Sequence, residues 1–510
     1  MMTKKDAAPD LHDKVTSGSA FLLVNRLAIK SMDVIILMVL TRCLLPSDFG
    51  RVAIAISTIQ IIETVLELQT GLALLQVPVI TRSHLNTAFT ITLLRGLAIM
   101  AVLMAAAVPL ARFYRDDHLT GLICALSVVP LLRSARSPKM VLCFKHLDFM
   151  PEATADLIGK IAALALAVAV GLMTRSYWAI AIGAIAAPLF FMLSSYVICP
   201  FRPAFTLRHR RLFYGYMGWG LAGQICSALN WQTDRFVLGK MVSHYDLGLF
   251  TAARDFAGTM VKVVIETLMR PIVAGLSATS GDKARLVRAY GKVTSATMAI
   301  GLPVGLGQAM VGKEIVAILL GAKWASAASI FSLVSLALIP ALYSSVTTNL
   351  FYAIGRPDLV FQRNLYDFLF RFPATIVMIA LAGLQGAVYA LIASEILLAG
   401  ICLLSVRKLF DISVTWLVAG SWRSLVSGLA MTGALALVRH LFPHGQGIGP
   451  SALYLMLAVP MGAAVYLATH LLCWSSTGSP EGIERYAMAF IVKRLRPSGR
   501  ARPCEPSTTP

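Results

Sequence analysis

Three charged residues interrupt an apolar stretch near the start of the sequence, which reads SGSAFLLVNRLAIKSMDVIILMVLTRCLL. Arg26, Lys30 and Asp33 are spaced i, i+4 and i+7, so a helix places them along one face. The stretch is long enough to cross a bilayer, which takes about 20 apolar residues. Because an unpaired charge at the bilayer centre costs about 3 kcal/mol or more, we expect this face to border a polar cavity.

Other apolar stretches carry charges at helical spacing, namely Glu63 and Glu67; Glu152, Asp156 and Lys160; Asp234 and Arg235; Arg254 and Asp255; Lys262, Glu266 and Arg270; and Asp367 and Arg371. Arg95 has no obvious local partner. Pairs of opposite charge can simply join helices, so a structural role stays open for each residue. Arg26, Lys30 and Arg95 outnumber the uncommitted acids near them, which predicts an anion site in the first half of the chain.

The composition indicates an integral membrane protein. Of 510 residues, 57% are hydrophobic and 14% are charged, whereas soluble domains carry about 25% charged residues. We expect no cleaved signal peptide, because the first apolar segment is too long and too charged. Eight cysteines are scattered singly, which predicts neither a disulfide framework nor a zinc site. The net charge of +20 is explained by loops and by cations within helices, so we expect no nucleic-acid partner.

Apolar length and flanking residues predict an all-α, polytopic protein of about fourteen transmembrane helices. The expected spans are residues 17–41, 49–69, 85–111, 119–140, 153–173, 176–199, 213–240, 247–275, 289–311, 326–352, 364–382, 385–405, 416–438 and 451–473. With the N-terminus inside, the cytoplasmic segments hold about 26 Lys and Arg residues and the outer connections about 9, which predicts that both termini are cytoplasmic.

The chain repeats itself at an offset of about six helices. Residues 47–55 read SDFGRVAIA and residues 245–253 read YDLGLFTAA. A second match joins residues 134–148 to residues 344–358, and an acid follows each, Asp156 and Asp367. An even number of helices gives both units the same orientation, which predicts two pseudo-symmetric six-helix bundles around a central binding site.

These patterns predict six regions: a cytoplasmic N-tail (1–16), an N-terminal bundle (17–199), a basic cytoplasmic linker (200–212), a C-terminal bundle (213–409), two additional transmembrane helices (410–473) and a basic cytoplasmic tail (474–510). The tail contains EGIERYAMAFIVKRLRP, which is compatible with an interfacial basic helix or with an unstructured segment. The sequence contains neither GxxxxGK[ST] nor HExxH nor GxSxG, so we expect no enzymatic activity and no cofactor.

Four segments together resemble the Wzx-like polysaccharide transporters of the multidrug/oligosaccharidyl-lipid/polysaccharide exporter superfamily: LLPSDFGRVAIA, FKHLDF, TDRFVLGKMVSHYDLGLFTAARDF and LLGAKWASA. The resemblance runs from about residue 17 to about residue 409. It implies two bundles that open alternately to either side of the bacterial inner membrane. It also implies a substrate, an oligosaccharide on an undecaprenyl pyrophosphate carrier.

The resemblance further implies a cationic central cavity, for which the matching candidates are Arg26, Lys30, Arg95, Lys262 and Arg270. Asp33, Glu63 and Asp234 are candidates to bind a coupling proton or Na⁺. Other expected partners are membrane lipids and the glycan polymerase machinery.

Three alternatives compete with this interpretation. An ion-coupled multidrug or small-molecule antiporter of the same superfamily calls for a more acidic, aromatic-lined cavity. A major-facilitator transporter calls for a GxxxDRxGRR-like loop, where this chain reads TGLALLQVPVITRSH. A membrane glycan polymerase or ligase calls for a large outer loop, which the short outer connections do not provide.

Overall fold

The computed structural model describes residues 25, 28–68, 70–75, 77–145, 148–214, 219–278, 282–441 and 447–478. The described residues are helical or lie in turns and connections, and none of them forms a strand. Arg26, the predicted N-tail and most of the predicted C-tail, with its expected interfacial helix, lie outside this part of the chain. The all-α fold class is therefore confirmed for the part that the structure describes.

The first half of the bundle contains a helix over residues 28–43 and the helices that follow it as far as residue 198. These are α2 (Pro46–Val65), α3 (Thr70–Leu75), α4 (Arg82–Tyr114), α5 (His118–Leu126), α6 (Val128–Ser134), α7 (Met140–Lys145), α8 (Met150–Thr174) and α9 (Trp178–Ile198). Residues 200–209 then form a non-helical connection to α10 (Arg210–Tyr214).

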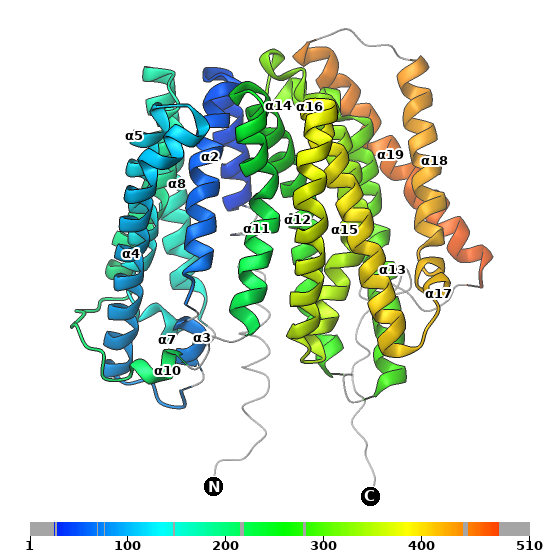
Figure 1. The fold of residues 1–510 in the computed structure, drawn as a ribbon. Helices are drawn as coiled ribbons and strands as arrows, with labels where there is room; N and C mark the ends of the chain where they lie inside the picture. The colour runs from blue at the N-terminus through cyan, green and yellow to red at the C-terminus, as the bar shows by residue number, and fades with distance from the viewer. Residues whose placement is uncertain are drawn as a thin grey trace, which may run out of the picture.

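The second half contains α11 (Trp219–Met241), α12 (His244–Ala278), α13 (Lys283–Met310), α14 (Gly312–Leu319), the 3-10 helix η1 (Ala322–Trp324), α15 (Ala327–Ala353) and α16 (Pro357–Phe410). After these come α17 (Val414–Ala419), α18 (Trp422–Leu441) and α19 (Ile448–Ser476). In Figure 1 the two halves stand beside each other, with α2 and α11 in the middle and α18 and α19 at the far edge.

Side chains and backbone geometry define where several helices begin and end. The Thr81 hydroxyl accepts a hydrogen bond from the backbone N–H of His84 at the start of α4, and Asp282 accepts two backbone N–H bonds at the start of α13. Gly383 interrupts α16 with φ 58°, a conformation that glycine adopts without strain. This break separates the two spans expected at 364–382 and 385–405.

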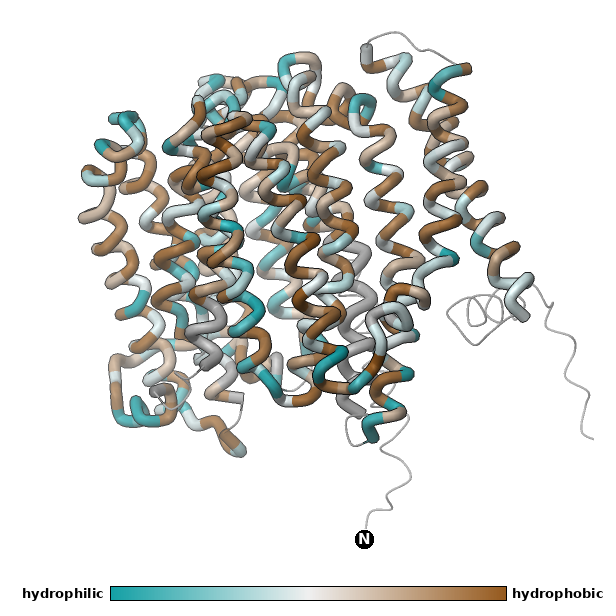
Figure 2. Tube along the Cα trace, turned by 45° about the vertical axis from the view of Figure 1, so that its right-hand side comes forward, coloured by the Kyte–Doolittle hydropathy of each residue, from teal (hydrophilic) through white to brown (hydrophobic). Residues whose placement is uncertain are grey.

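Each of the fourteen expected spans coincides with helical residues in the part that is described. Among the described residues, seven helices are long and apolar enough to cross a membrane, and the pair α13 and α14, bent by 73°, makes an eighth if it counts as one span. Figure 2 shows hydrophobic residues along most of the length of the helices. Outward apolar side chains such as Leu172 and Leu381 are 60% and 77% exposed, as a lipid-facing surface requires.

Two spans differ from their expected extent, and in one of them, 416–438, α17 ends at Ala419 and α18 begins at Trp422. Residues 119–140 are predicted as one span, but α6 ends at Ser134 and a non-helical segment separates it from α7. The turn contains Pro138 and brings Arg136 out of the helix. This difference matters for the site, since it places Arg133 in the last turn of α6 and Arg136 in the turn that follows.

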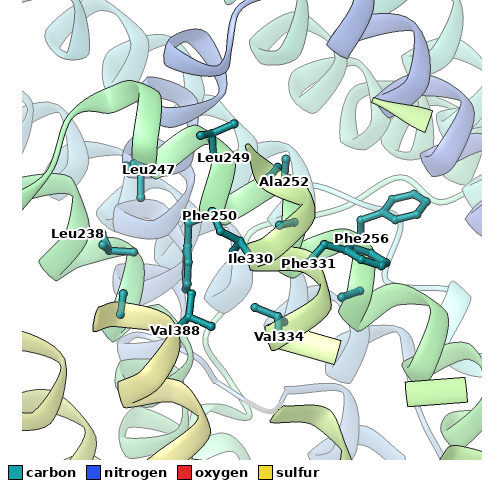
Figure 3. Packing of buried hydrophobic residues seen from close by; sticks show 14 of the residues in the cluster. Leu238, Leu247, Leu249, Phe250, Ala252, Phe256, Ile330, Phe331, Val334 and Val388 are labelled. Carbon is teal, nitrogen blue, oxygen red and sulfur yellow. The ribbon is translucent and has the colours of Figure 1, made fainter. Parts of the chain in front are cut away.

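The second half has a tightly packed apolar core. Figure 3 shows Phe250 of α12 among side chains of α11, α15 and α16, and the Phe256 and Phe331 rings lie 6.1 Å apart. The two additional helices contact this half through Tyr466 of α19, which donates to the carbonyl of Ala299 on α13 at 2.8 Å, and through Arg439 of α18. Arg439 donates to the carboxylate of Glu314 on α14 at 2.8 Å and to the carbonyl of Met310 at 3.1 Å.

The halves meet closely at one end of the bundle. We call the end that carries α14 the upper end and the end that carries α3, α7 and α10 the lower end (Figure 1). At the upper end, a Cβ added to Gly50 would overlap the carbonyl oxygen of His244, and one added to Gly248 would overlap that of Pro46. These glycines occupy the same position of the repeated SDFG and YDLG segments, so the contact is reciprocal.

Candidate functional site

The candidate site is a charged cavity in the lower part of the first half. A cavity of about 870 Å³ is lined from α2, α3, α4, α6, α7, α8 and α9. A second cavity of about 530 Å³ shares Glu63, Glu67, Arg95 and Arg133 with it. The second cavity is also lined by Trp231 and Gln232 of α11, so the polar space reaches the seam between the halves.

The larger cavity is strongly charged without being strongly positive. Its lining contains cations and acids in equal numbers: Arg95, Arg133, Arg136 and Lys160 against Glu63, Glu67, Glu152 and Asp156. Each of these residues lies on or next to a helix that is otherwise apolar. Charges within a membrane-spanning bundle are rarely retained without a partner, a pathway or a ligand.

Arg95 and Arg136 have hydrogen-bond donors that the described side chains leave unused. Arg95 Nη2 donates to the backbone carbonyl of Glu63 at 3.2 Å, while its buried Nε has no partner among the described residues. Arg136 forms no ion pair with any side chain that the structure describes, and it is exposed at the cavity. Arg133 differs, because it donates to the Glu63 carboxylate at 2.8 Å. Two guanidinium groups can therefore donate to an anion here.

Lys30 and Asp33, on the helix over residues 28–43, lie close to Lys160 of α8. Lys160 Nζ donates to Asp33 Oδ1 at 2.6 Å, and Lys30 Nζ lies 3.8 Å from Asp33 Oδ2. The side chains of Lys30, Asp33 and Lys160 are 45%, 34% and 27% exposed within the protein. The Asp33 carboxylate thus lies between two ammonium groups, and all three side chains remain partly exposed.

Asp234 lies in a different environment, in the middle of the second half. It is fully buried, and it accepts hydrogen bonds from Arg254 at 2.6 Å and from Arg371 at 3.0 Å. Arg371 also lies 3.5 Å from Glu395 and 3.8 Å from Asp367. Arg235 forms an ion pair with Asp255 nearby. These groups neutralise one another within helices α11, α12 and α16.

The predicted site residues therefore fall into three groups. Arg95 and Glu63 line the cavity, Lys30 and Asp33 form a partly exposed cluster with Lys160, and Asp234 lies in a buried ion cluster. The backbone positions of Lys262 and Arg270 lie on α12, and their side chains are outside the described part of the structure, as is Arg26. The structure does not bring Asp234 together with Asp33 and Glu63.

Arg133 and Arg136 line the cavity, although the sequence analysis does not name them among the candidate site residues. Their spacing of three residues, near the end of an apolar stretch, is the only signal in the sequence. That signal does not distinguish a solvated loop from a cavity wall. Their position depends on α6 ending at Ser134 and on the turn before α7.

Contacts at the upper end close the seam between the halves above this cavity. Arg42 Nη2 donates to the carbonyl of Ile318 at 2.8 Å, and Trp324 Nε1 donates to that of Thr41 at 3.0 Å. Asp116 accepts from Arg51 at 2.8 Å, and its carboxylate lies 3.2 Å from His244 Nε2. Deeper in the seam, the amide of Gln232 donates to Gln60. The polar space is therefore covered at the upper end.

The sequence of the chain is similar to those of known proteins. The succinoglycan biosynthesis transport protein ExoT of Rhizobium meliloti (strain 1021) is 22% identical over 477 residues, covering 90% of this chain and 93% of ExoT. The lipopolysaccharide biosynthesis protein WzxC of Escherichia coli (strain K12) is 20% identical over 414 residues, covering 76% of this chain and 80% of WzxC. Both matches extend through both halves of the bundle.

Two solved structures have a similar fold. An inward closed conformation of the lipid II flippase MurJ superposes with a TM-score of 0.70 at 13% identity, covering 90% of this chain and 99% of MurJ. An inward-facing multidrug resistance MATE family transporter superposes with a TM-score of 0.56 at 13% identity, covering 76% of this chain and 98% of the transporter. At these identities, the likeness shows the fold.

Residues 39–329, more than half of the chain, match the polysaccharide biosynthesis protein family. The match contains the repeated SDFG and YDLG segments, most of the cavity-lining helices and the upper seam. The chain belongs to the polysaccharide biosynthesis protein family, and its resemblance to the Wzx-like polysaccharide transporters is confirmed.

Proposed function

We propose that this protein is a flippase that moves an oligosaccharide linked to undecaprenyl pyrophosphate from the cytoplasmic to the periplasmic leaflet of the bacterial inner membrane. The glycan is a repeat unit of a lipopolysaccharide, capsule or exopolysaccharide. The observation that carries the proposal is the cavity of about 870 Å³ beneath a closed upper seam, with unused guanidinium donors in its wall. The names of ExoT and WzxC support a role in polysaccharide export.

The physical requirement is the transfer of a dianionic head group across about 30 Å of hydrocarbon. Such a group cannot cross unaided, because its hydration must be replaced within the membrane. Arg95 and Arg136 offer forked N–H donors that match phosphate oxygens. We propose that they bind the pyrophosphate, and that the balanced charges around them, such as Glu152, hydrogen-bond the sugars.

We propose that the lower end faces the cytoplasm, with both termini on that side. The basic segments at this end, which include Arg208, Arg211, Lys283 and Arg288, support this orientation. The cavity is then accessible from the leaflet in which the lipid-linked substrate is made, and the upper seam blocks its release. In this orientation, a membrane potential that is negative inside favours outward movement of an anion by about 2.3 kcal/mol per charge per 100 mV.

We propose alternating access between the two bundles of residues 17–199 and 213–409. Opening the upper seam requires Gly50 and Gly248 to part from the backbone carbonyls that they contact. Closing the lower end brings α12, which carries Lys262 and Arg270, toward the first half. We keep both residues, together with Arg26 and Lys30, as proposed contacts of the substrate.

Coupling to a proton or Na⁺ is a further part of the proposal. Asp33 supports it best, because its carboxylate lies between Lys30 and Lys160 and remains partly exposed. Glu63 is held by Arg133 at the cavity. Asp234 is surrounded by Arg254 and Arg371, so an ion reaches it only if those pairs separate.

The alternative function is ion-coupled export of drugs or small molecules, since multidrug transporters share the fold. Reconstitution distinguishes the two. Proteoliposomes that contain the purified protein are loaded either with a lipid-linked oligosaccharide or with a fluorescent drug cation, and transfer to the opposite side is measured under the same potential. We expect transfer of the lipid-linked oligosaccharide and no protein-dependent movement of the cation. The opposite result would overturn the proposal in favour of the antiporter.

A further inference from the structure

We propose a second anion site at the lower end of the first half, which binds the phosphate head group of an anionic membrane lipid. It is a cavity of about 710 Å³ between the connection after α3, the first turn of α4 and the segment around α10. None of the described side chains that line it is acidic, whereas Arg208, Arg210, Arg211, His84 and His209 are basic. This site is distinct from the charged cavity and does not depend on the proposed function.

The charge of this site differs in kind from that of the larger cavity. There, acids and cations are balanced, while here the arginines have no described acid in the lining to neutralise them. The His84 and His209 rings lie 4.1 Å apart and form one wall. Lys145 adds a further cation behind the wall, where its ammonium donates to the carbonyls of Val77 at 2.6 Å and Pro78 at 2.8 Å. Such a concave basic surface attracts an anion.

The position of the site indicates a lipid as the source of that anion. The 33 residues of α4 span about 50 Å, whereas the hydrocarbon core is about 30 Å thick, so its ends extend to the level of the head groups. The site is formed at the first turn of this helix. Phe205 and Val79 beside it are 76% and 73% exposed. Exposed apolar groups next to arginines are typical of a segment that lies in the membrane interface.

A lipid bound here contacts the wall of the charged cavity from behind. The Lys145 bonds join the connection after α3 to α7. The neighbouring residues Leu74 of α3 and Met140 of α7 line the larger cavity. The head group is therefore expected to stabilise the lower end of the first half around α3, α7 and α10.

Thermal stability in nanodiscs tests this site with the full-length protein. Discs of phosphatidylcholine receive increasing fractions of phosphatidylglycerol, and the unfolding midpoint is followed for three proteins. These are the wild type, the triple variant Arg208→Gln/Arg210→Gln/Arg211→Gln, and the matched control Lys283→Gln/Arg285→Gln/Arg288→Gln. We expect phosphatidylglycerol to stabilise the wild type and the control at the same fraction. The first variant is expected to require a fraction of phosphatidylglycerol at least about tenfold higher for the same stabilisation.

Two further arms identify the source of the anion and guard against misfolding. Inorganic phosphate is added to pure phosphatidylcholine discs, where we expect little stabilisation. The Lys-substituted variant Arg208→Lys/Arg210→Lys/Arg211→Lys retains the charge, and we expect it to keep most of the response to phosphatidylglycerol. Full stabilisation by inorganic phosphate would assign the site to a soluble anion and overturn the lipid assignment. Equal losses in both Gln variants would show a general charge effect and overturn the site itself.

Discussion

Lys160 Nζ donates a hydrogen bond to the carboxylate of Asp33 at 2.6 Å, and this pair joins α8 to the helix over residues 28–43. The second half repeats the pairing, since Arg371 of α16 donates to Asp234 of α11 at 3.0 Å. In both halves an acid lies four residues before the cation, at Asp156 and Asp367. The environments differ, because the first pair is about one-third exposed and the second is buried. Both repeats therefore contain an ion pair between these helices, and the two pairs differ in how far they are exposed.

The two pairs predict losses of stability of different size when the acid is removed. Asp234→Asn leaves Arg254 and Arg371 without their shared carboxylate in a buried position, so we expect a loss of about 3–5 kcal/mol of stability. Asp33→Asn removes a partly exposed pair, so we expect a loss of about 1 kcal/mol or less. Unfolding of the purified variants in detergent measures the difference.

A transport assay tests the proposed role of Asp33 in ion coupling. We expect Asp33→Asn to reduce the rate of transfer in proteoliposomes while the protein remains folded, because the carboxylate is proposed to bind the coupling ion. Lys160→Met in the same assay tests whether the effect comes from the pair. Wild-type transfer by a stable Asp33→Asn protein would rule out ion coupling at this residue.

The unused guanidinium donors predict a defect in substrate affinity. Arg95→Gln and Arg136→Gln each remove charge-assisted hydrogen bonds to the pyrophosphate, so we expect the half-saturating substrate concentration to rise about tenfold for each. The matched controls are Arg112→Gln, on the same helix as Arg95, and Lys139→Gln, three residues after Arg136; both side chains are exposed and neither lines the cavity. A similar rise in the controls would contradict the assignment of the two arginines.

The reciprocal glycine contact predicts a conformational effect of added methyl groups. In Gly50→Ala and Gly248→Ala, the new Cβ overlaps a backbone carbonyl of the opposite half, so we expect the upper seam to open. Spin labels on cysteines at Asp117 and Ser326, in a background without the native cysteines, report the distance across this end. We expect the mean distance to increase in both variants and to stay unchanged in Gly121→Ala, where no atom lies within 4 Å of the added group.

The break in α16 predicts a purely backbone effect on stability. Gly383 has φ 58° and an added Cβ meets nothing within 4 Å, so Gly383→Ala changes strain without a clash. We expect a loss of about 1–3 kcal/mol. Gly400→Ala lies in the same element and also meets nothing within 4 Å, and there we expect no loss or a gain of up to about 1 kcal/mol. Thermal unfolding of both variants makes the comparison, and equal effects would show that an alanine at position 383 is not strained.

Much of the fold could be predicted from the sequence because the signals are local. Apolar length alone locates helices such as α8 and α18. The SDFG and YDLG segments predict that the chain contains two repeated bundles, and in the structure these same segments contact each other at Gly50 and Gly248. Spacing also predicts that Asp33 and Lys30 share a face. These conclusions need only one helix or one repeat at a time.

The partners of the charges could not be predicted, since they depend on contacts between distant segments. Arg371 lies 137 positions from Asp234, and Lys160 lies 127 positions from Asp33. Nothing near Asp234 in the sequence shows that it is buried while Asp33 is partly exposed. The place of Arg136 in the cavity wall likewise depends on a turn whose geometry arises from packing between α6 and α9.

The glycine contact at the upper seam is made by Cα atoms and peptide carbonyls, none of which ionises between ordinary extremes of acidity. Added electrolyte does not screen such a contact, and the acidity of the solution does not alter it. We therefore expect any response of seam opening to either condition to come from the charged side chains at the same end, namely Arg42 and the Arg51, Asp116 and His244 cluster. The seam thus has an uncharged part that does not respond and a charged part that can.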